Sequence, residues 1–302
     1  MSKLTRSRLF LTAFGLLTSL IGCGGSTKTT TTPPPATNVI AYLHRISGVT
    51  YEIKVLKNDG TTNTVSPTGL YISVVLSPDG QTILFSCADC FTQALGYQIG
   101  TMNADGSGQT LLGPGIYPQY TPDASKIVYE TGSGGAIGVM NADGSNQTSI
   151  GNTGEFCFPA TNGSLIAVGE YNGNSQGLAT MNMDGSNQQI ILPSAYMVYP
   201  AFSADGTQII FGYVNSAEAT NIFSVDTDGS NLVDLTNSTY NWDPLVVGST
   251  IYFNSTPSSI QNPTVDDDQI YSITTDGSNL TAVTNDTLYD GFRTWNGRCL
   301  AP

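Results

Sequence analysis

SPDGQTILFS, residues 77–86, is the segment that decides the fold, because related segments recur along the rest of the chain. Its Pro-Asp-Gly portion supplies the fixed proline φ and the positive glycine φ that tight turns require. The residues after the turn alternate polar and apolar β-formers, as a half-buried antiparallel strand does. The later members of this first turn series are centred on Asp123, Asn162, Asp205 and Gly248, with a degenerate member at Asn296.

A second turn series alternates with the first and reads DGSN or a close variant. Its members are separated by about 43 residues on average, a spacing typical of β-propeller blades. Each series marks one hairpin per unit, so each unit contains four short strands. Residues 39–302 then divide into six such units. The aspartates of this second series are Asp59, Asp105, Asp143, Asp184, Asp228 and Asp276.

The two ends of the repeated region complement each other. Residues 39–43 match a strand that follows a turn of the first series, and residues 292–297 match a strand that leads into one. One blade would then combine one C-terminal strand with three N-terminal strands, a clasp that leaves no open edge at the ring junction. We therefore predict an all-β fold, a six-bladed β-propeller of four-stranded antiparallel blades.

The start of the chain has the pattern of an export signal. A basic stretch precedes the apolar run Leu9–Ile21, which is too short to span a bilayer as a helix. Residues 20–23, LIGC, resemble a bacterial lipobox, which implies a signal peptide over 1–22 and lipidation of Cys23. An ordinary signal peptide with a chance cysteine is the alternative. Residues 23–38 read as a flexible Thr- and Pro-rich tether.

Gly24, the residue after the lipidated cysteine, refines the expected location. In Gram-negative lipoproteins an aspartate at this position signals retention at the inner membrane. We therefore expect a domain anchored to the cell envelope, at the outer membrane, facing either the periplasm or the outside.

Charge and composition exclude several classes of protein. The chain has 10 Lys and Arg against 23 Asp and Glu, a formal charge of −13. Nucleic-acid binding needs clustered cations, so we expect none. A single histidine, His44, excludes sites that require two, and we place it in a partly exposed structural role at the end of the first strand. Hydrophobic residues make up 39%, enough for a folded core.

The two phased turn series resemble the repeats of TolB-type six-bladed β-propellers, also called WD40-like PD40 repeats. The resemblance covers residues 39–302 and implies a module that docks a protein or peptide. TolB has an additional α/β domain before its propeller, where this chain has the tether. Related propellers form the non-catalytic part of prolyl-oligopeptidase-like enzymes, and we expect no hydrolase domain here.

Catalytic and metal-binding motifs are weak in this sequence. No G-x-S-x-G motif is present, and the Gly-rich residues 131–138 lack the lysine of a phosphate loop. Residues 226–231 begin like a calcium loop, but Asn237 stands where the bidentate glutamate belongs. We expect no cofactor and no metal site. The run 266–268, DDD, is a candidate for weak binding of a divalent cation, with a solvated acidic loop as the alternative.

The cysteines are assigned from their spacing and from export. Cys87 and Cys90 form the sequence C-A-D-C, which favours a short-loop disulfide in an exported protein. Cys157 and Cys299 fall on blades that are three apart. We expect both to be unpaired and buried, because the ring would hold them too far apart for a bond.

The residues entering each innermost strand are the candidate ligand site. In a propeller, the first residues of the innermost strands surround one mouth of the central channel. Here aromatic residues would lie on one arc of this mouth and acidic residues on the other. This combination suits a peptide, a cationic group or a sugar, and we expect Arg293 to pair with Asp290. Packing that seals the blades is the alternative. The residues are Tyr71, Ser73, Tyr117, Phe158, Tyr199, Trp242, Asp243, Tyr289, Asp290 and Arg293.

Three functions follow from this pattern. The first is a lipid-anchored, monomeric, non-catalytic module that docks a protein or peptide at the channel mouth or on a flat face. The second is an enzyme that degrades an envelope or extracellular polysaccharide or peptide, with Asp243 and Asp290 dividing acid and base roles. The third is a passive structural lipoprotein.

Overall fold

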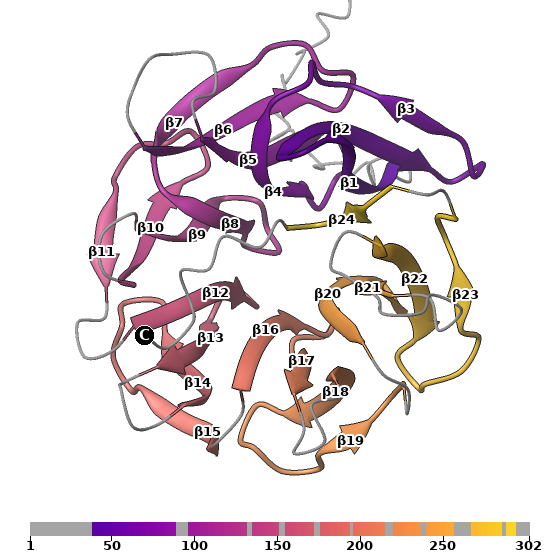
Figure 1. Cartoon of the computed structure of the whole chain (residues 1–302). Helices are drawn as coiled ribbons and strands as arrows, with labels where there is room; N and C mark the ends of the chain where they lie inside the picture. Colours follow the sequence, from indigo (N-terminus) through magenta and orange to yellow (C-terminus); the bar gives the residue numbers. More distant parts are fainter. Residues whose placement is uncertain are drawn as a thin grey trace, which may run out of the picture. The chain divides into compact units, whose positions relative to one another are not determined.

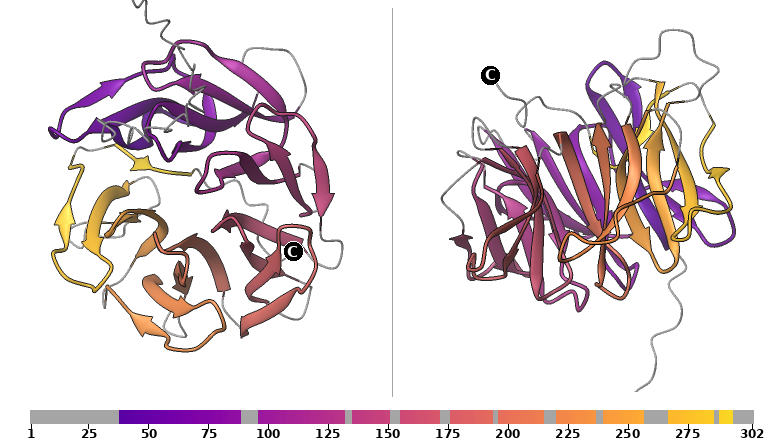
Figure 2. Two further views of the ribbon diagram at one scale, coloured as in Figure 1. Left: turned by 180° about the vertical axis from the view of Figure 1, so that it is seen from behind. Right: turned by 90° about the horizontal axis from the view of Figure 1, so that it is seen from below.

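The predicted propeller is present. A computed structural model describes residues 38–88, 96–131, 135–150, 155–171, 176–193, 196–214, 220–236, 240–256, 267–285 and 288–293. These residues form six four-stranded antiparallel sheets arranged around a central axis (Figure 1). The view from behind shows the same ring, and the view from below shows it from its edge (Figure 2). The predicted signal peptide, Cys23 and nearly all of the tether lie outside the described residues.

The first three blades contain the N-terminal half of the described chain, together with the C-terminal strand β24. The first sheet has the order β24-β1-β2-β3, and its innermost strand is the C-terminal strand β24. Its strands are β24 (Asp290–Gly291), β1 (Asn38–Ser47), β2 (Thr50–Lys57) and β3 (Thr62–Thr64). The second blade has β4 (Leu70–Leu76), β5 (Thr82–Ala88), β6 (Tyr97–Asn103) and β7 (Thr110–Pro114). The third has β8 (Ile116–Tyr120), β9 (Lys126–Glu130), β10 (Ile137–Asn141) and β11 (Thr148–Ile150).

The remaining three blades follow the same order from the axis outward. The fourth blade has β12 (Glu155–Thr161), β13 (Leu165–Tyr171), β14 (Gln176–Asn182) and β15 (Gln189–Pro193). The fifth has β16 (Tyr196–Phe202), β17 (Gln208–Val214), β18 (Thr220–Asp226) and β19 (Val233–Asp234). The sixth has β20 (Asn241–Val247), β21 (Thr250–Ser255), β22 (Gln269–Thr274) and β23 (Thr281–Ala282).

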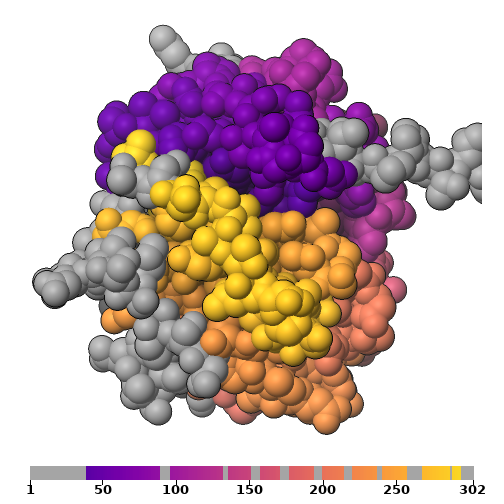
Figure 3. Space-filling model, turned by 90° about the vertical axis from the view of Figure 1, so that its right-hand side faces the viewer, coloured from indigo at the N-terminus to yellow at the C-terminus, as the bar shows by residue number. Residues whose placement is uncertain are grey.

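The ring closes by the predicted clasp. Strand β24 pairs with β1, where Leu43 lies opposite Gly291 and His44 opposite Asp290. In the next blade, the amide of Val74 donates to the carbonyl of Phe292. On the side of the molecule seen in Figure 3, the C-terminal strands pack directly against the N-terminal blade. Chain segments from both ends therefore share one sheet, and its innermost edge is covered.

The turns of both series form because each aspartate accepts bonds from its own turn. In the first series, the Ser77 hydroxyl and the Gln81 amide donate to Asp79 Oδ1, at 2.6 and 3.0 Å. In the second series, the Ser107 amide and hydroxyl donate to Asp105 Oδ1, at 2.9 and 2.6 Å. A side-chain oxygen that accepts a hydrogen bond from the amide two residues later forms an Asx turn, which Asp and Asn favour.

Both turn series lie on the same face of the ring. Within one blade, the Ala104 amide next to the second-series turn donates to the carbonyl of Gln81 in the first-series turn. The same bond joins Ala142 to Ser125 and Thr227 to Thr207. The alternation of antiparallel strands requires this arrangement, because the first and third hairpins of a blade point the same way.

The core lies between neighbouring blades. Leu43 and Ile53 of the first sheet pack with Tyr71, Ile83 and Phe85 of the next. In five blades, the second residue of the second strand is an isoleucine that has no exposed surface, and these are Ile83, Ile127, Ile166, Ile209 and Ile251. Full burial of such a side chain contributes about 1.5–3 kcal/mol. In the part of the chain that the structure describes, no helix is long and apolar enough to cross a membrane.

Candidate functional site

A β-bulge interrupts the innermost strand of several blades at the same place. In three blades, a non-glycine residue with positive φ precedes a proline: Tyr117 at 51°, Phe158 at 54° and Asp243 at 55°. Each lies at a register shift against the second strand. Such a conformation costs about 1–3 kcal/mol for a bulky residue, and bulges commonly re-aim side chains next to functional sites. The three residues are buried around the ring axis.

Aromatic residues of neighbouring innermost strands contact one another with their rings tilted. The rings of Tyr117 and Phe158 have centroids 4.7 Å apart, and those of Phe158 and Tyr199 are 4.3 Å apart. The guanidinium of Arg293 lies 5.5 Å from the Phe158 centroid and 6.0 Å from the Tyr117 centroid, which is cation–π geometry. This cluster fills the centre of the ring.

Arg293 also makes an ion pair with Asp243. Its Nη1 lies 3.2 Å from Asp243 Oδ1, and Asp243 is only 2% exposed. Burial raises the pKa of Asp243 to about 6, against a smaller lowering by Arg293. Oδ2 of Asp243 is buried and accepts no hydrogen bond. The expected pairing of Arg293 with Asp290 is wrong, because the register of β24 places Asp290 beside His44 of β1.

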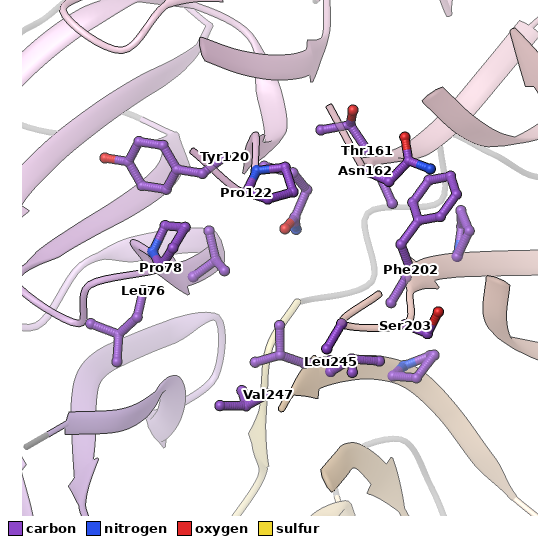
Figure 4. Close-up of a pocket in the computed structure, with 18 of the residues that line it drawn as sticks. Leu76, Pro78, Tyr120, Pro122, Thr161, Asn162, Phe202, Ser203, Leu245 and Val247 are labelled. Atoms are coloured by element: carbon purple, nitrogen blue, oxygen red, sulfur yellow. The ribbon is translucent and has the colours of Figure 1, made fainter. Parts of the chain in front are cut away.

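A cavity of about 600 Å³ lies on the axis, where the innermost strands end. Its walls come from the last residues of five innermost strands and from the first-series turns, and Figure 4 shows these side chains around a central opening. Asp243 and Arg293 also line it, and we call them the floor. Asp243 lies two and four residues before the wall residues Leu245 and Val247, at the bulge of the same strand. The labelled wall residues are Leu76, Pro78, Tyr120, Pro122, Thr161, Asn162, Phe202, Ser203, Leu245 and Val247.

The predicted mouth residues are mostly interior residues. Only Asp243 and Arg293 of that set line the axial cavity. Trp242 is half-buried, and the others are nine-tenths or more buried. Ser73 bonds Ser86 at 2.6 Å between hydroxyls. The Tyr289 hydroxyl donates a hydrogen bond to the backbone carbonyl of Arg293.

The cavity lies farther along the same strands than the predicted site. The residues that the prediction missed are the strand ends and the prolines at the first-series turns. The signal for them was present, because Pro78 and Pro122 belong to the repeated turn motif itself. Proline at the exposed first-series turns of two blades brings apolar surface to the axis without a buried amide that needs a partner.

His44 and the acidic run differ from expectation. His44 is buried rather than partly exposed, and Asp268 has no exposed surface, so the run 266–268 is not a solvated loop at that residue. The Thr256 hydroxyl donates to Asp268 Oδ1 at 2.6 Å, and the Asp290 amide donates to the Asp268 carbonyl. Asp268 thus joins the sixth blade to the clasp, while Asp266 lies outside the described residues. Among residues whose positions are described, no three His, Cys, Asp or Glu side chains are grouped as for a metal ion.

The cysteines differ in part from expectation. Cys87 is disulfide-bonded. Cys90 lies outside the described residues, so its pairing with Cys87 stays a prediction. Cys157 is also disulfide-bonded, and the expectation that it is unpaired is wrong. Cys157 belongs to the cluster of Tyr117 and Phe158 near the axis, where even distant blades approach closely.

Solved propellers resemble this ring at identities that show the fold alone. A protein from Agrobacterium tumefaciens assigned as a TolB matches with a TM-score of 0.64 and 15% identity, over 85% of this chain and 91% of that chain. TolB from Acinetobacter baumannii matches with a TM-score of 0.64 and 16% identity, over 81% of this chain and 63% of that chain. A chain in a nidogen/laminin complex matches with a TM-score of 0.58 and 14% identity, over 78% of this chain and 89% of that chain. No protein-family model and no curated protein matches the sequence.

Proposed function

We propose that this protein is an exported, lipid-anchored binding module that docks a protein or peptide partner at the axial cavity. The observation that carries the proposal is the cavity itself, whose walls combine apolar side chains with polar ones such as Thr161 and Asn162 above a charged floor. Its volume lies in the range of ligand pockets, which bind through apolar walls and a few placed polar groups. A single side chain or a short peptide segment fits this space.

The construction of the floor supports a binding role. Three bulged residues with positive φ keep side chains pointed at the axis in a conformation that they would otherwise avoid. The aromatic cluster and the ion pair hold Arg293 from two sides. A floor fixed in this way loses little conformational entropy when a ligand arrives, which favours affinity.

The anchor is proposed from the sequence. The LIGC motif and the Thr- and Pro-rich tether favour a propeller held at the envelope by lipid on Cys23. A tether of this composition lets the ring reach a partner on the same membrane or beyond it. The second TolB structure and this chain share only a propeller-sized part, so the role of TolB is not carried over.

An enzyme with Asp243 and Asp290 as acid and base has less support. Asp290 is not among the residues that line the cavity, and its Oδ1 lies 2.7 Å from His44 Nδ1. A paired-carboxylate mechanism requires both groups to face one substrate. We therefore propose a non-catalytic module, since a fold alone assigns no chemistry.

The test is a crosslinking capture from native envelopes with full-length protein as bait. Val247, at the cavity wall, is 38% exposed, so Val247→Tyr narrows the opening without disturbing the core. The matched control is Val49→Tyr, because Val49 is 70% exposed in the β1–β2 turn on the other face. We expect a partner that wild type and Val49→Tyr capture and that Val247→Tyr loses. Equal capture by all three would place binding elsewhere and refute the cavity as the docking site.

A further inference from the structure

The face that surrounds the axial cavity is strongly acidic. Nine exposed aspartates of the two turn series lie on it. Three of them stand at the cavity, and we call Asp79, Asp123 and Asp205 the rim aspartates: Asp205 lines the cavity, as do the neighbours Pro78 and Pro122 of the other two. The other six form an outer ring, and these are Asp59, Asp105, Asp143, Asp184, Asp228 and Asp276.

Few cations balance this charge. In the parts of the chain with described positions, Lys57 and Lys126 are the basic residues that flank these turns. Hydrogen bonds from Thr121 and Ser125 lower the pKa of Asp123 to about 2, and hydrogen bonds from Ser107 lower that of Asp105. The face therefore stays negatively charged throughout the neutral and mildly acidic range.

Turn geometry alone does not require the charge. Asn162 occupies an equivalent first-series turn, where its Oδ1 accepts from the amides of Ser164 and Leu165 at 3.0 and 2.7 Å. An uncharged amide therefore forms the same kind of turn. Nine carboxylates on one face are a property of the surface rather than a condition of the fold.

We propose that this acidic face receives a cationic polypeptide segment, with one apolar side chain in the axial cavity and lysines or arginines over the rim aspartates. The inference rests on the proposed function and names the chemistry of its partner. The apolar side chains of the walls, among them Leu76, Phe202 and Leu245, suit the anchor residue. At the floor, Oδ2 of Asp243 accepts no hydrogen bond within the protein, so a donor on the bound segment that reached it would satisfy it.

The charge of the face argues against other occupants. A nucleic acid or an anionic membrane would be repelled, and so would a second copy of this chain, whose net charge is −13. A metal ion needs several ligands at one point, and no three His, Cys, Asp or Glu side chains of the described residues are grouped in that way. A cationic segment would interact favourably with aspartates all around the ring. Complementary charge also speeds the encounter of the segment with the face.

The experiment measures binding of labelled peptides to the full-length protein by fluorescence anisotropy. The probe is a Gly/Ser peptide with one central Phe flanked by lysines. Two control peptides replace the lysines with glutamates or the Phe with Gly. The measurement is made at 0.15 M ionic strength, where the Debye length is about 8 Å, so that each charge interacts only with charges close to it. We expect the Lys–Phe peptide alone to bind, and its affinity to fall roughly tenfold in 0.5 M salt.

Two matched triple variants locate the site. Asp79→Asn, Asp123→Asn and Asp205→Asn remove the rim charges, and Asp105→Asn, Asp143→Asn and Asp228→Asn remove outer charges from the same blades. Both triples change the net charge equally and keep the Asx turns. We expect the rim triple to weaken binding about tenfold or more and the outer triple at most about threefold. Equal losses in the two triples would overturn the proposal.

The outcomes separate this inference from the proposed function. If the Glu–Phe peptide binds as well as the Lys–Phe peptide, and Val247→Tyr abolishes both, the cavity binds peptides and the cationic preference is refuted. If no peptide binds while the envelope capture still yields a cavity-dependent partner, the cationic segment is refuted and the binding module stands. If both experiments fail, the proposed function fails as well.

Discussion

The carboxylate Oδ1 of Asp290 lies 2.7 Å from the imidazole Nδ1 of His44, although 246 residues separate the two in the sequence. Asp290 is 1% and His44 7% exposed. They face each other across the pairing of β24 with β1, the only ladder in the described residues that joins the two ends of the chain. This pair therefore fixes the register of the clasp.

Breaking this pair should loosen the ring. Because the partner is left buried without its bond, His44→Ala and Asp290→Ala should each lower the free energy of unfolding by about 2–4 kcal/mol. The double variant should lose less than the sum of the two, with a coupling of about 0.5–3 kcal/mol. Urea unfolding of the four proteins gives the cycle. Fully additive losses would mean that the two side chains act independently of each other.

Gly106 should tolerate no side chain, whereas Gly48 should tolerate a small one. Both have positive φ, at 87° and 52°. A Cβ on Gly106 would lie 1.9 Å from the carbonyl oxygen of Val65 in the neighbouring blade, and a Cβ on Gly48 meets nothing within 4 Å. Gly48→Ala should cost about 1 kcal/mol of unfolding free energy from the backbone alone. Gly106→Ala should cost at least about 2 kcal/mol more, because the blade contact must open. Equal costs in thermal unfolding would contradict the close approach.

The blades and the clasp could be predicted because their signals are local. Asp-Gly turns specify hairpins within a few residues, and two phased series fix both the number of strands in a blade and the number of blades. The unmatched strand at each end then leaves one way to close the ring. None of this requires knowledge of how blades are staggered against one another.

The floor of the cavity could not be predicted because it depends on that stagger. The bulge before Pro244 decides how deep Asp243 lies, and the register of β24 decides whether Arg293 meets Asp243 or Asp290. The expectation for Cys157 failed for a related reason. It treated Cys157 as too far from other blades to form a bond, whereas Cys157 packs near the axis in a cluster with Tyr117 and Tyr199 of the two neighbouring blades.

The two disulfides should be separable by peptide mapping. If Cys87 pairs with Cys90, as the C-A-D-C spacing predicts, the partner of Cys157 is Cys23 or Cys299. Lipidation of Cys23 would leave Cys299. We therefore expect a non-reduced digest to contain a crosslinked peptide pair with Cys157 and Cys299. Reduction of the Cys157–Cys299 bond, which closes a long loop, should lower the unfolding free energy by about 2–4 kcal/mol. A Cys87–Cys299 pair in the digest would refute the C-A-D-C assignment.

Stability should depend on the protonation of Asp243. Burial raises its pKa to about 6 in the folded protein, above the ordinary value near 4 that it regains on unfolding. The folded state therefore holds the proton more tightly, and the associated stability is complete below pH 4 and is lost as pH rises through 6. Asp243→Asn removes this dependence. Relative to wild type, the variant should gain about 1–3 kcal/mol of unfolding free energy between pH 4 and pH 7.5.

Urea unfolding of both proteins at the two pH values measures that gain, and Asp123→Asn is the control. The folded pKa of Asp123 is about 2, lowered first by the Thr121 hydroxyl, so its carboxyl is ionised in the folded state over the whole range and in the unfolded state above about pH 5. The difference between Asp123→Asn and wild type should therefore change little between pH 4 and pH 5 and stay constant above it. A constant difference for Asp243→Asn as well would mean that Arg293 outweighs burial and keeps Asp243 ionised. The floor of the cavity would then be a fixed ion pair at every physiological pH.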